Sequence, residues 1–248
     1  REQQIHDADF ALSAAASYFF MDDLGSAKVL WNSVHADSIN NEYQYSLYNV
    51  LALAFMGRMP NASDINLAQS ILSFWNNSDE NALNDFLKKY RNQIYCTDSP
   101  ESWFWGEIAC AIAKLVCKSS ARLLLPSYSG LGKKSWTPYF KRPTAINLLW
   151  PSQKLVGSSD ILRGKNALLQ LPTGVGKTRS IELIIWSMLL SKRGNKAIIV
   201  APLRSLCNEI SFDVRAAFPQ EISINQFSDV LEDDFIDVLL GQAEKQIL

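Results

Sequence analysis

The feature of the sequence that most constrains the fold is a glycine-rich turn between an apolar run and an amphipathic helix. Residues 166–171 (Asn-Ala-Leu-Leu-Gln-Leu) have the composition of a short buried parallel strand. Residues 178–191 carry apolar side chains at the three- and four-residue spacing of a helix. The turn between them holds two glycines and then Lys177. A strand joined to a helix in this way predicts an α/β domain built on a parallel sheet.

The turn has the composition of a phosphate-binding loop (P-loop). Its glycines permit positive φ angles and let backbone N–H groups approach phosphate oxygens, while the following helix adds the partial positive charge of its N-terminus. Lys177 can then meet the β- and γ-phosphates of ATP, and the Thr178 hydroxyl can bind Mg²⁺. Leu171 stands where the general pattern of such loops has glycine, so the strict pattern fails at its first position. The nucleotide-binding residues predicted here are Pro172, Thr173, Gly174, Val175, Gly176, Lys177 and Thr178, the last two as the catalytic pair.

Strands and helices continue to alternate after this loop. Residues 196–201 and 222–227 predict two further strands, and residues 203–217 and 228–243 predict two further helices. Residues 245–248 have the pattern of a strand that is just beginning. This alternation is typical of an open parallel α/β sheet.

Residues 1–130 predict an all-helical domain. Alanine, leucine and aromatic residues recur with helical spacing in segments 10–20, 45–56, 67–75, 82–90 and 103–116. Residues 98–101 (Asp-Ser-Pro-Glu) predict a helix start, with a capping side chain, an early proline and an acid in the first turn. Residues 126–134 are rich in Gly, Ser and Pro and predict a linker. We therefore expect a helical accessory domain at 1–130 and a partial α/β domain at 131–248.

The charge distribution favours an anionic ligand for the second domain. Residues 131–210 contain 13 basic and three acidic residues, a net charge of +10, whereas residues 1–130 and 211–248 have net charges of −5 and −6. A positive block suits phosphate or nucleic acid, although the blocks could instead pair with each other within the fold. No apolar run reaches the ~18 residues of a membrane span, and the polar N-terminus is no signal peptide. The four cysteines form no Cys-x-x-Cys pair, so we expect a cytoplasmic protein without a membrane segment or a zinc site.

Three segments together resemble the superfamily 2 helicases, especially the Ski2-like branch. Residues 172–178 resemble motif I of this family, in which Leu or Ala is common at the first loop position. Residues 149–153 (Leu-Trp-Pro-Ser-Gln) resemble its glutamine motif, which implies that Gln153 reads the adenine edge, since a carboxamide can donate and accept at once. The family also stacks an upstream aromatic residue on the base, and the candidates are Trp136, Tyr139 and Phe140.

Residues 201–209 resemble motif Ia of the same family. The resemblance implies that Arg204 and Ser205 hold the backbone of a single nucleic-acid strand, DNA in preference to RNA. Arg204 could instead be solvated or pair with Glu209.

The resemblance covers residues 143–248 and implies the first half of a RecA-like domain of an ATP-dependent helicase or translocase. Motif II, the D-E-x-H/D box, and the second RecA-like domain are not among the 248 residues. Because the chain also begins without methionine, we expect it to be the N-terminal part of a longer protein and to be inactive as an ATPase by itself. A helical domain before such a motor resembles the helicase subunits of bacterial anti-phage systems of the Hachiman type, which implies docking of an effector, such as a nuclease, on the helical domain.

Two other functions fit the same residues. The α/β part could be a nucleotide switch on a helical adaptor, which holds ATP without moving along nucleic acid. The chain could also be the motor subunit of a restriction–modification complex. A D-E-x-H box and a second RecA-like domain beyond residue 248 would exclude the switch, and a nuclease motif there would favour restriction.

Overall fold

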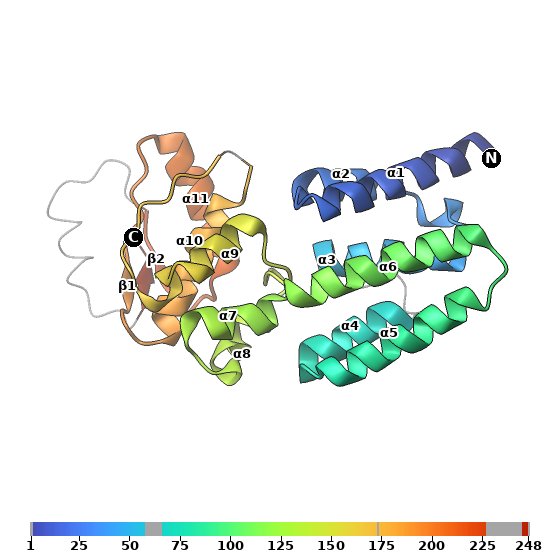
Figure 1. Ribbon diagram of the computed structural model, residues 1–248. Helices are drawn as coiled ribbons and strands as arrows, with labels where there is room; N and C mark the ends of the chain where they lie inside the picture. The colour runs from blue at the N-terminus through green and yellow to red at the C-terminus, as the bar shows by residue number, and fades with distance from the viewer. Residues whose placement is uncertain (1, 58–65, 173, 227–244, 248) are drawn as a thin grey trace, which may run out of the picture. The chain divides into compact units, whose positions relative to one another are not determined.

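The computed structural model describes residues 2–57, 66–172, 174–226 and 245–247 (Figure 1). The chain divides into two compact units, Arg1–Leu124 with Ile146–Pro151, and Leu125–Ala145 with Ser152–Leu248.

The segment that the sequence predicts as a linker, 126–134, is more regular than expected, because its first four residues are helical and a 3-10 turn begins at residue 133. Helix α7 (Ala121–Ser129) runs through Pro126, and a 3-10 turn follows at Lys133–Trp136. The Ser129 hydroxyl donates to the Leu125 carbonyl at 2.7 Å and accepts from the Trp136 indole at 3.0 Å. These contacts fix a stretch whose Gly, Ser and Pro content alone indicates a loop.

The first unit is all-helical. Its helices are α1 (Glu2–Phe20), α2 (Leu24–Ser33), α3 (Glu42–Met56), α4 (Asn66–Asn77), α5 (Glu80–Tyr95) and α6 (Pro100–Lys118). They pack in three layers, with α3 and α6 between the α1–α2 pair and the α4–α5 pair (Figure 1). The five helical segments predicted from the sequence all lie within these helices. Within the described ranges, no helix of either unit is long and apolar enough to cross a membrane.

Capping residues explain where two of these helices begin. Helix α6 starts as predicted: the Ser99 side chain accepts from the Ser102 N–H at 3.3 Å, and Pro100 takes the first helical position. The sequence did not predict α2, because residues 22–25 (Asp-Asp-Leu-Gly) indicate a break, although Leu24 and Gly25 already belong to the helix. Asp23 in fact caps this helix, since its Oδ1 accepts from the Ser26 N–H at 3.2 Å.

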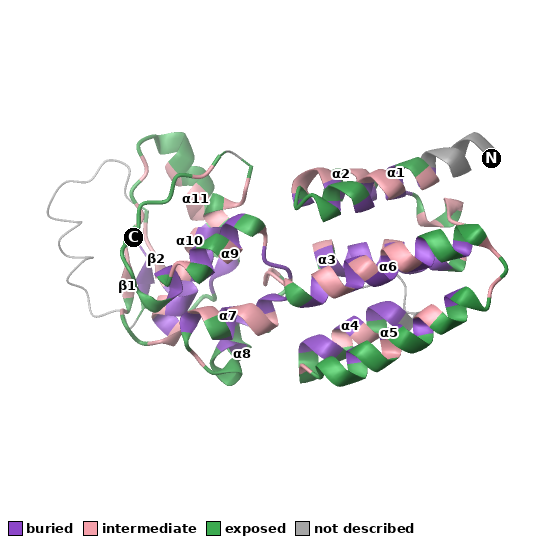
Figure 2. Ribbon diagram, viewed as in Figure 1, coloured by how far each residue is buried: buried purple, intermediate pink, exposed green. Residues whose placement is uncertain are grey.

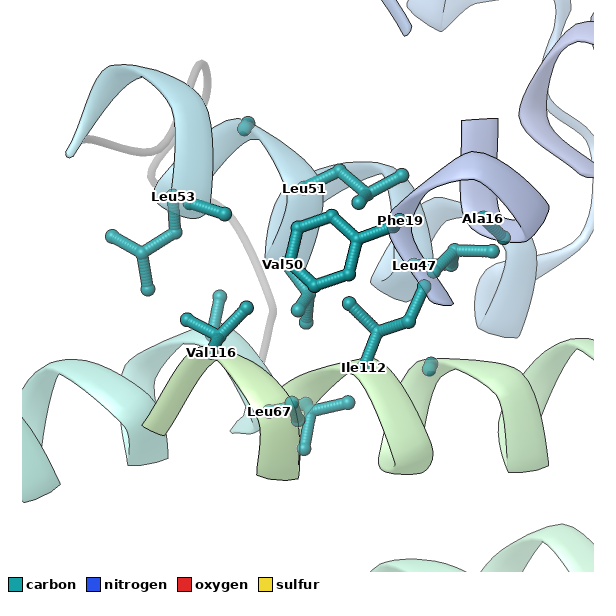
Figure 3. Close-up of a cluster of buried hydrophobic side chains, with 14 of the residues drawn as sticks. Ala16, Phe19, Leu47, Val50, Leu51, Leu53, Leu67, Ile112 and Val116 are labelled. Atoms are coloured by element: carbon teal, nitrogen blue, oxygen red, sulfur yellow. The ribbon is translucent and has the colours of Figure 1, made fainter. Parts of the chain in front are cut away.

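The core of the first unit lies where α3 meets α6. Leu47 and Val50 of α3 and Ile112 of α6 are fully buried, and Phe19 of α1 and Leu67 of α4 reach the same cluster (Figure 3). Helix α3 is buried over most of its length, whereas most residues of the outer helix α5 are exposed (Figure 2). The middle layer therefore supplies the apolar surface that holds the outer layers.

The second unit combines helices with a small parallel sheet. Its main elements are α8 (Thr137–Phe140), α9 (Pro151–Ser158), α10 (Lys177–Leu190), α11 (Arg204–Ala217), β1 (Lys196–Ala197), β2 (Ser223–Ile224) and β3 (Gln246–Ile247). Strand β3 lies between β1 and β2 and is parallel to both, with Gln246 opposite Lys196 and Ser223. The predicted parallel sheet is confirmed for these strands.

The strand predicted at 166–171 is not formed, and the other predicted strands are shorter than expected. Leu168 is 98% exposed, and only the first two residues of 196–201 belong to a strand. An apolar run favours burial, but a strand forms only beside a hydrogen-bonded neighbour, and no described segment pairs with 166–171. The helix predicted at 228–243 lies outside the described residues.

Candidate nucleotide and nucleic-acid site

The predicted phosphate loop lies between a segment without regular secondary structure, which includes Leu171, and the first turn of α10. Gly174 and Gly176 both have a φ of +81°, a backbone conformation that other residues rarely adopt. Gly176 occupies the N-cap position of α10, where it has no side chain to satisfy the first N–H groups of the helix. The turn thus leaves these donors to an external acceptor, which is the arrangement that binds an anion at a helix N-terminus.

The loop has the space and the charge that a triphosphate needs. A Cβ built on Gly174 would meet no atom within 4 Å, and Lys177 is exposed at the first position of α10. Thr178 follows it, half-buried, with a hydroxyl of the kind that binds Mg²⁺ in such loops. The residues present therefore fit ATP with Mg²⁺. Thr173, also assigned to the loop from the sequence, lies outside the described residues.

Two buried residues at the start of α9 contact the loop. The Ser152 hydroxyl donates to the Val175 carbonyl at 2.6 Å. The Gln153 side chain is 3% exposed, and its Nε2 would lie 3.3 Å from a Cβ built on Gly176. The glutamine motif is thus packed against the phosphate loop, while adenine recognition by Gln153 stays a prediction. Sequence reasoning missed Ser152, whose only signal was its place beside Gln153.

The three aromatic candidates for stacking on a base differ in exposure. Trp136 and Tyr139 are fully buried, and the Tyr139 ring meets the Trp186 ring edge-on at 5.7 Å between centroids. Phe140 is half-buried, so it is the one of the three that keeps surface for a base.

A buried carboxylate that the sequence analysis did not single out lies in α10, close behind the loop. Glu182 is 5% exposed and accepts hydrogen bonds from Arg142 Nη2 and, at 2.7 Å, from Arg179 Nη1. The Arg142 guanidinium also packs on two rings, with its Cζ 4.7 Å from the Tyr139 centroid and 4.9 Å from the Trp186 centroid. The available signal was an acid in the middle of an otherwise apolar helix.

Arg179 is held in its charged form by its surroundings. Burial alone lowers the pKa of Arg179, but the hydrogen bond to Glu182 and the negative charges of Glu182 and Asp213 raise this pKa above its ordinary value. The guanidinium is therefore a permanent cation beside the loop.

A pocket opens beside Thr178. Its lining consists of Thr144, Thr178, Arg179, Glu182, Asp213, Val214, Ala216 and Ala217. The last four residues come from α11, and the Thr144 hydroxyl donates to the Ala216 carbonyl at 3.4 Å. The C-terminal part of α11 therefore lies next to the start of α10.

The predicted nucleic-acid residues lie at the opposite end of α11. Arg204 and Ser205 are its first two residues, and both are exposed. The helix is anchored by its other end, because Trp186 Nε1 donates to the Ala217 carbonyl at 3.3 Å and the Trp186 ring stacks on Phe218 at 5.3 Å. The N-terminus of α11 is thus presented to solvent on a fixed helix.

The comparison with protein families covers a large part of this second unit. Residues 151–239 match the family model of DEAD/DEAH box helicases. The chain is 44% identical over 64 residues to the ATP-dependent DNA helicase Hel308 of Pyrococcus horikoshii, a match that covers 26% of this chain and 9% of that protein. It is 41% identical over 64 residues to Hel308 of Thermococcus kodakarensis, with 26% and 6% covered.

A further match is to the Hachiman protein HamB of Bacillus cereus, with 32% identity over 80 residues, 32% of this chain and 7% of that protein. All of these matches span less than a tenth of the relatives' own length.

Proposed function

Because residues 151–239 match the family model of the DEAD/DEAH box helicases, we propose that the chain is a part of an ATP-dependent nucleic-acid helicase or translocase. Its second unit would then be the first part of a RecA-like domain. The observation that carries the proposal is the backbone of the phosphate loop, with a φ of +81° at both Gly174 and Gly176 immediately before α10.

The residues of the loop have distinct roles in this proposal. Backbone N–H groups between Pro172 and Thr178 and the Lys177 ammonium bind the phosphates, and the Thr178 hydroxyl binds Mg²⁺. Gln153 contacts the adenine, and Ser152 holds the loop through its hydrogen bond to the Val175 carbonyl. Hydrolysis of the bound MgATP in the complete protein supplies the free energy for movement along the strand.

The second ligand in this proposal is a single nucleic-acid strand. Arg204, Ser205 and the N–H groups at the start of α11 would hold one of its phosphates. The net charge of +10 between residues 131 and 210 supports an anionic partner. The name of the Hel308 relatives, DNA helicase, favours DNA over RNA.

We further propose that this motor acts in anti-phage defence, with the helical unit as the docking site of an effector such as a nuclease. The similarity to the Hachiman protein HamB supports this role. The helices α1–α6 lie outside the matched residues 151–239, and residues 1–130 have a net charge of −5, which suits a protein partner better than nucleic acid.

Nucleotide binding is tested with the substitution Lys177→Ala. Loss of one charge-assisted contact to phosphate costs roughly 1.5–3 kcal/mol, so MgATP should bind roughly 10- to 150-fold more weakly. Isothermal titration calorimetry of the wild type and the variant measures the change. The control is Lys165→Ala, since Lys165 is an exposed lysine of the same unit. The proposal fails if the wild type does not bind MgATP or if both variants bind it equally well.

Nucleic-acid binding is tested with Arg204→Ala. We expect weaker binding of single-stranded DNA and a plot of log K against log salt whose slope is shallower by about 0.7, the value for one lost phosphate contact. Fluorescence anisotropy with a labelled oligonucleotide at several salt concentrations gives both quantities. Arg215→Ala is the matched control, because Arg215 lies at the other end of α11 and donates to the Ile224 carbonyl. An unchanged slope for Arg204→Ala would remove this residue from the interface, and no DNA binding at all would favour the nucleotide switch.

A further inference from the structure

The pocket beside Thr178 has one wall that none of the helicase motifs explains. Arg179 Nη1 donates both to Glu182 Oε2, at 2.7 Å, and to the Thr144 carbonyl, at 3.4 Å. Arg142 donates to the other oxygen of the same carboxylate. One buried carboxylate therefore ties the segment 139–144 to the first turns of α10.

The position of the two arginines in this wall depends on the negative charge of Glu182. Two guanidinium groups meet one carboxylate, and the Arg142 side chain is only 12% exposed. Removal of the carboxylate charge would leave two close cations without their shared partner, one of them in a largely buried place. The hydrogen bonds that hold residues 142 and 144 beside the first turns of α10 would then be weakened, while the Tyr139–Trp186 ring contact would still hold the start of the segment.

The pocket differs chemically from the phosphate loop. Asp213 contributes a carboxylate, which accepts hydrogen bonds from hydroxyl and amino groups, whereas the Glu182 carboxylate already accepts from Arg142 and Arg179. Val214 and two alanines add an apolar surface that suits a flat ring. Because Thr178 marks the metal and phosphate end of the loop, the part of a nucleotide that fits this pocket is the nucleoside.

We propose that Glu182 is a positioning residue for nucleoside binding, which fixes Arg179 and Thr144 in the lining of a pocket that receives the ribose and base. The proposal rests on the proposed binding of a nucleotide at the phosphate loop. It gives Glu182, Arg142 and Arg179 a role in affinity for ATP although none of them belongs to a helicase motif identified above.

The test compares ATP with inorganic tripolyphosphate, both with Mg²⁺, because only ATP carries a nucleoside. Glu182→Gln keeps the size of the side chain and removes its charge. We expect affinity for ATP to fall about tenfold, as for a lost charged hydrogen bond, while affinity for tripolyphosphate changes less than about twofold. Glu182→Asp keeps the charge and should recover most of the affinity for ATP. Titration calorimetry measures both ligands.

A second variant and a control in the other unit complete the test. Arg179→Ala breaks the link to the Thr144 carbonyl at a side chain that is 47% exposed, so this variant decides the question if Glu182→Gln does not fold. Glu107→Gln removes a carboxylate that binds Arg91 at 2.7 Å in the other unit, and it should affect neither ligand.

Equal losses for ATP and tripolyphosphate, or no loss of ATP affinity in either variant, would overturn the positioning role. If Lys177→Ala weakens neither ligand, the proposed nucleotide site itself is wrong, which is a separate outcome.

Discussion

Replacement of Gly176 by valine is expected to abolish nucleotide binding. The φ of +81° at this position costs a residue with a side chain about 1–2 kcal/mol, and more for a β-branched one. The new Cβ would also lie 3.3 Å from Gln153 Nε2, inside ordinary van der Waals distance. Because Gly176 is the N-cap of α10, any relief of this strain moves Lys177 and Thr178 at the same time.

Substitutions at two other glycines separate the conformational cost from the close contact with Gln153. Gly174→Ala meets the same φ but has no atom within 4 Å of its Cβ, so it should show the conformational cost alone, roughly 5- to 30-fold in affinity. Gly132→Ala has neither problem, since its φ is −64° and its surroundings are open, and it should bind as the wild type does. Calorimetry with MgATP gives the affinities, and circular dichroism verifies folding. A folded Gly176→Val variant with normal affinity for ATP would show that the loop is not the nucleotide site.

The glycine turn before α10 could be predicted because its signal is local. Glycine, lysine and threonine at fixed spacing constrain the backbone over a few residues, and the family match at 151–239 confirms the predicted resemblance to helicases. The start of α6 was predictable for the same reason, since Ser99 and Pro100 act on the turn in which they stand.

Features that depend on distant parts of the chain could not be predicted in the same way. Residues 166–171 have the composition of a buried strand, but hydrogen-bonded neighbours decide whether a strand forms, and periodicity carries no information about them. The partners of Glu182 lie 40 residues before it, at Arg142, and one turn before it, at Arg179, so only the folded chain shows that they share one carboxylate.

In the helical unit, the sequence pattern predicts the helices but not the function of the unit. The spacing of alanine, leucine and aromatic residues predicted five helices correctly. The same spacing occurs in helical bundles of unrelated function, so it does not indicate what the unit binds. The role of this unit therefore has to be tested through its stability and its partner.

Ile112→Ala is expected to lower the free energy of unfolding of the first unit by about 2–5 kcal/mol. Ile112 is fully buried where α6 meets α3, in the cluster with Leu47 and Val50 (Figure 3). Truncation removes apolar contacts and leaves a cavity in a close-packed layer that holds the outer helices. Hydrogen exchange measured by mass spectrometry should show the loss as faster exchange in α3 and α6, with exchange in α10 unchanged because α10 belongs to the other unit.

The matched control for this substitution is Val29→Ala on α2, where the side chain is 70% exposed. Its effect on stability should stay within about 0.5 kcal/mol, since a surface truncation leaves no cavity. Similar effects of the two substitutions would mean that the α3–α6 interface is not the core. The pair also tests function, because Ile112→Ala should keep the affinity for MgATP of the second unit while it weakens docking of an effector on the first. Loss of ATP binding in Ile112→Ala would instead indicate that the helical unit is part of the nucleotide site. That result would contradict the proposal that the first unit docks an effector and the second unit binds ATP.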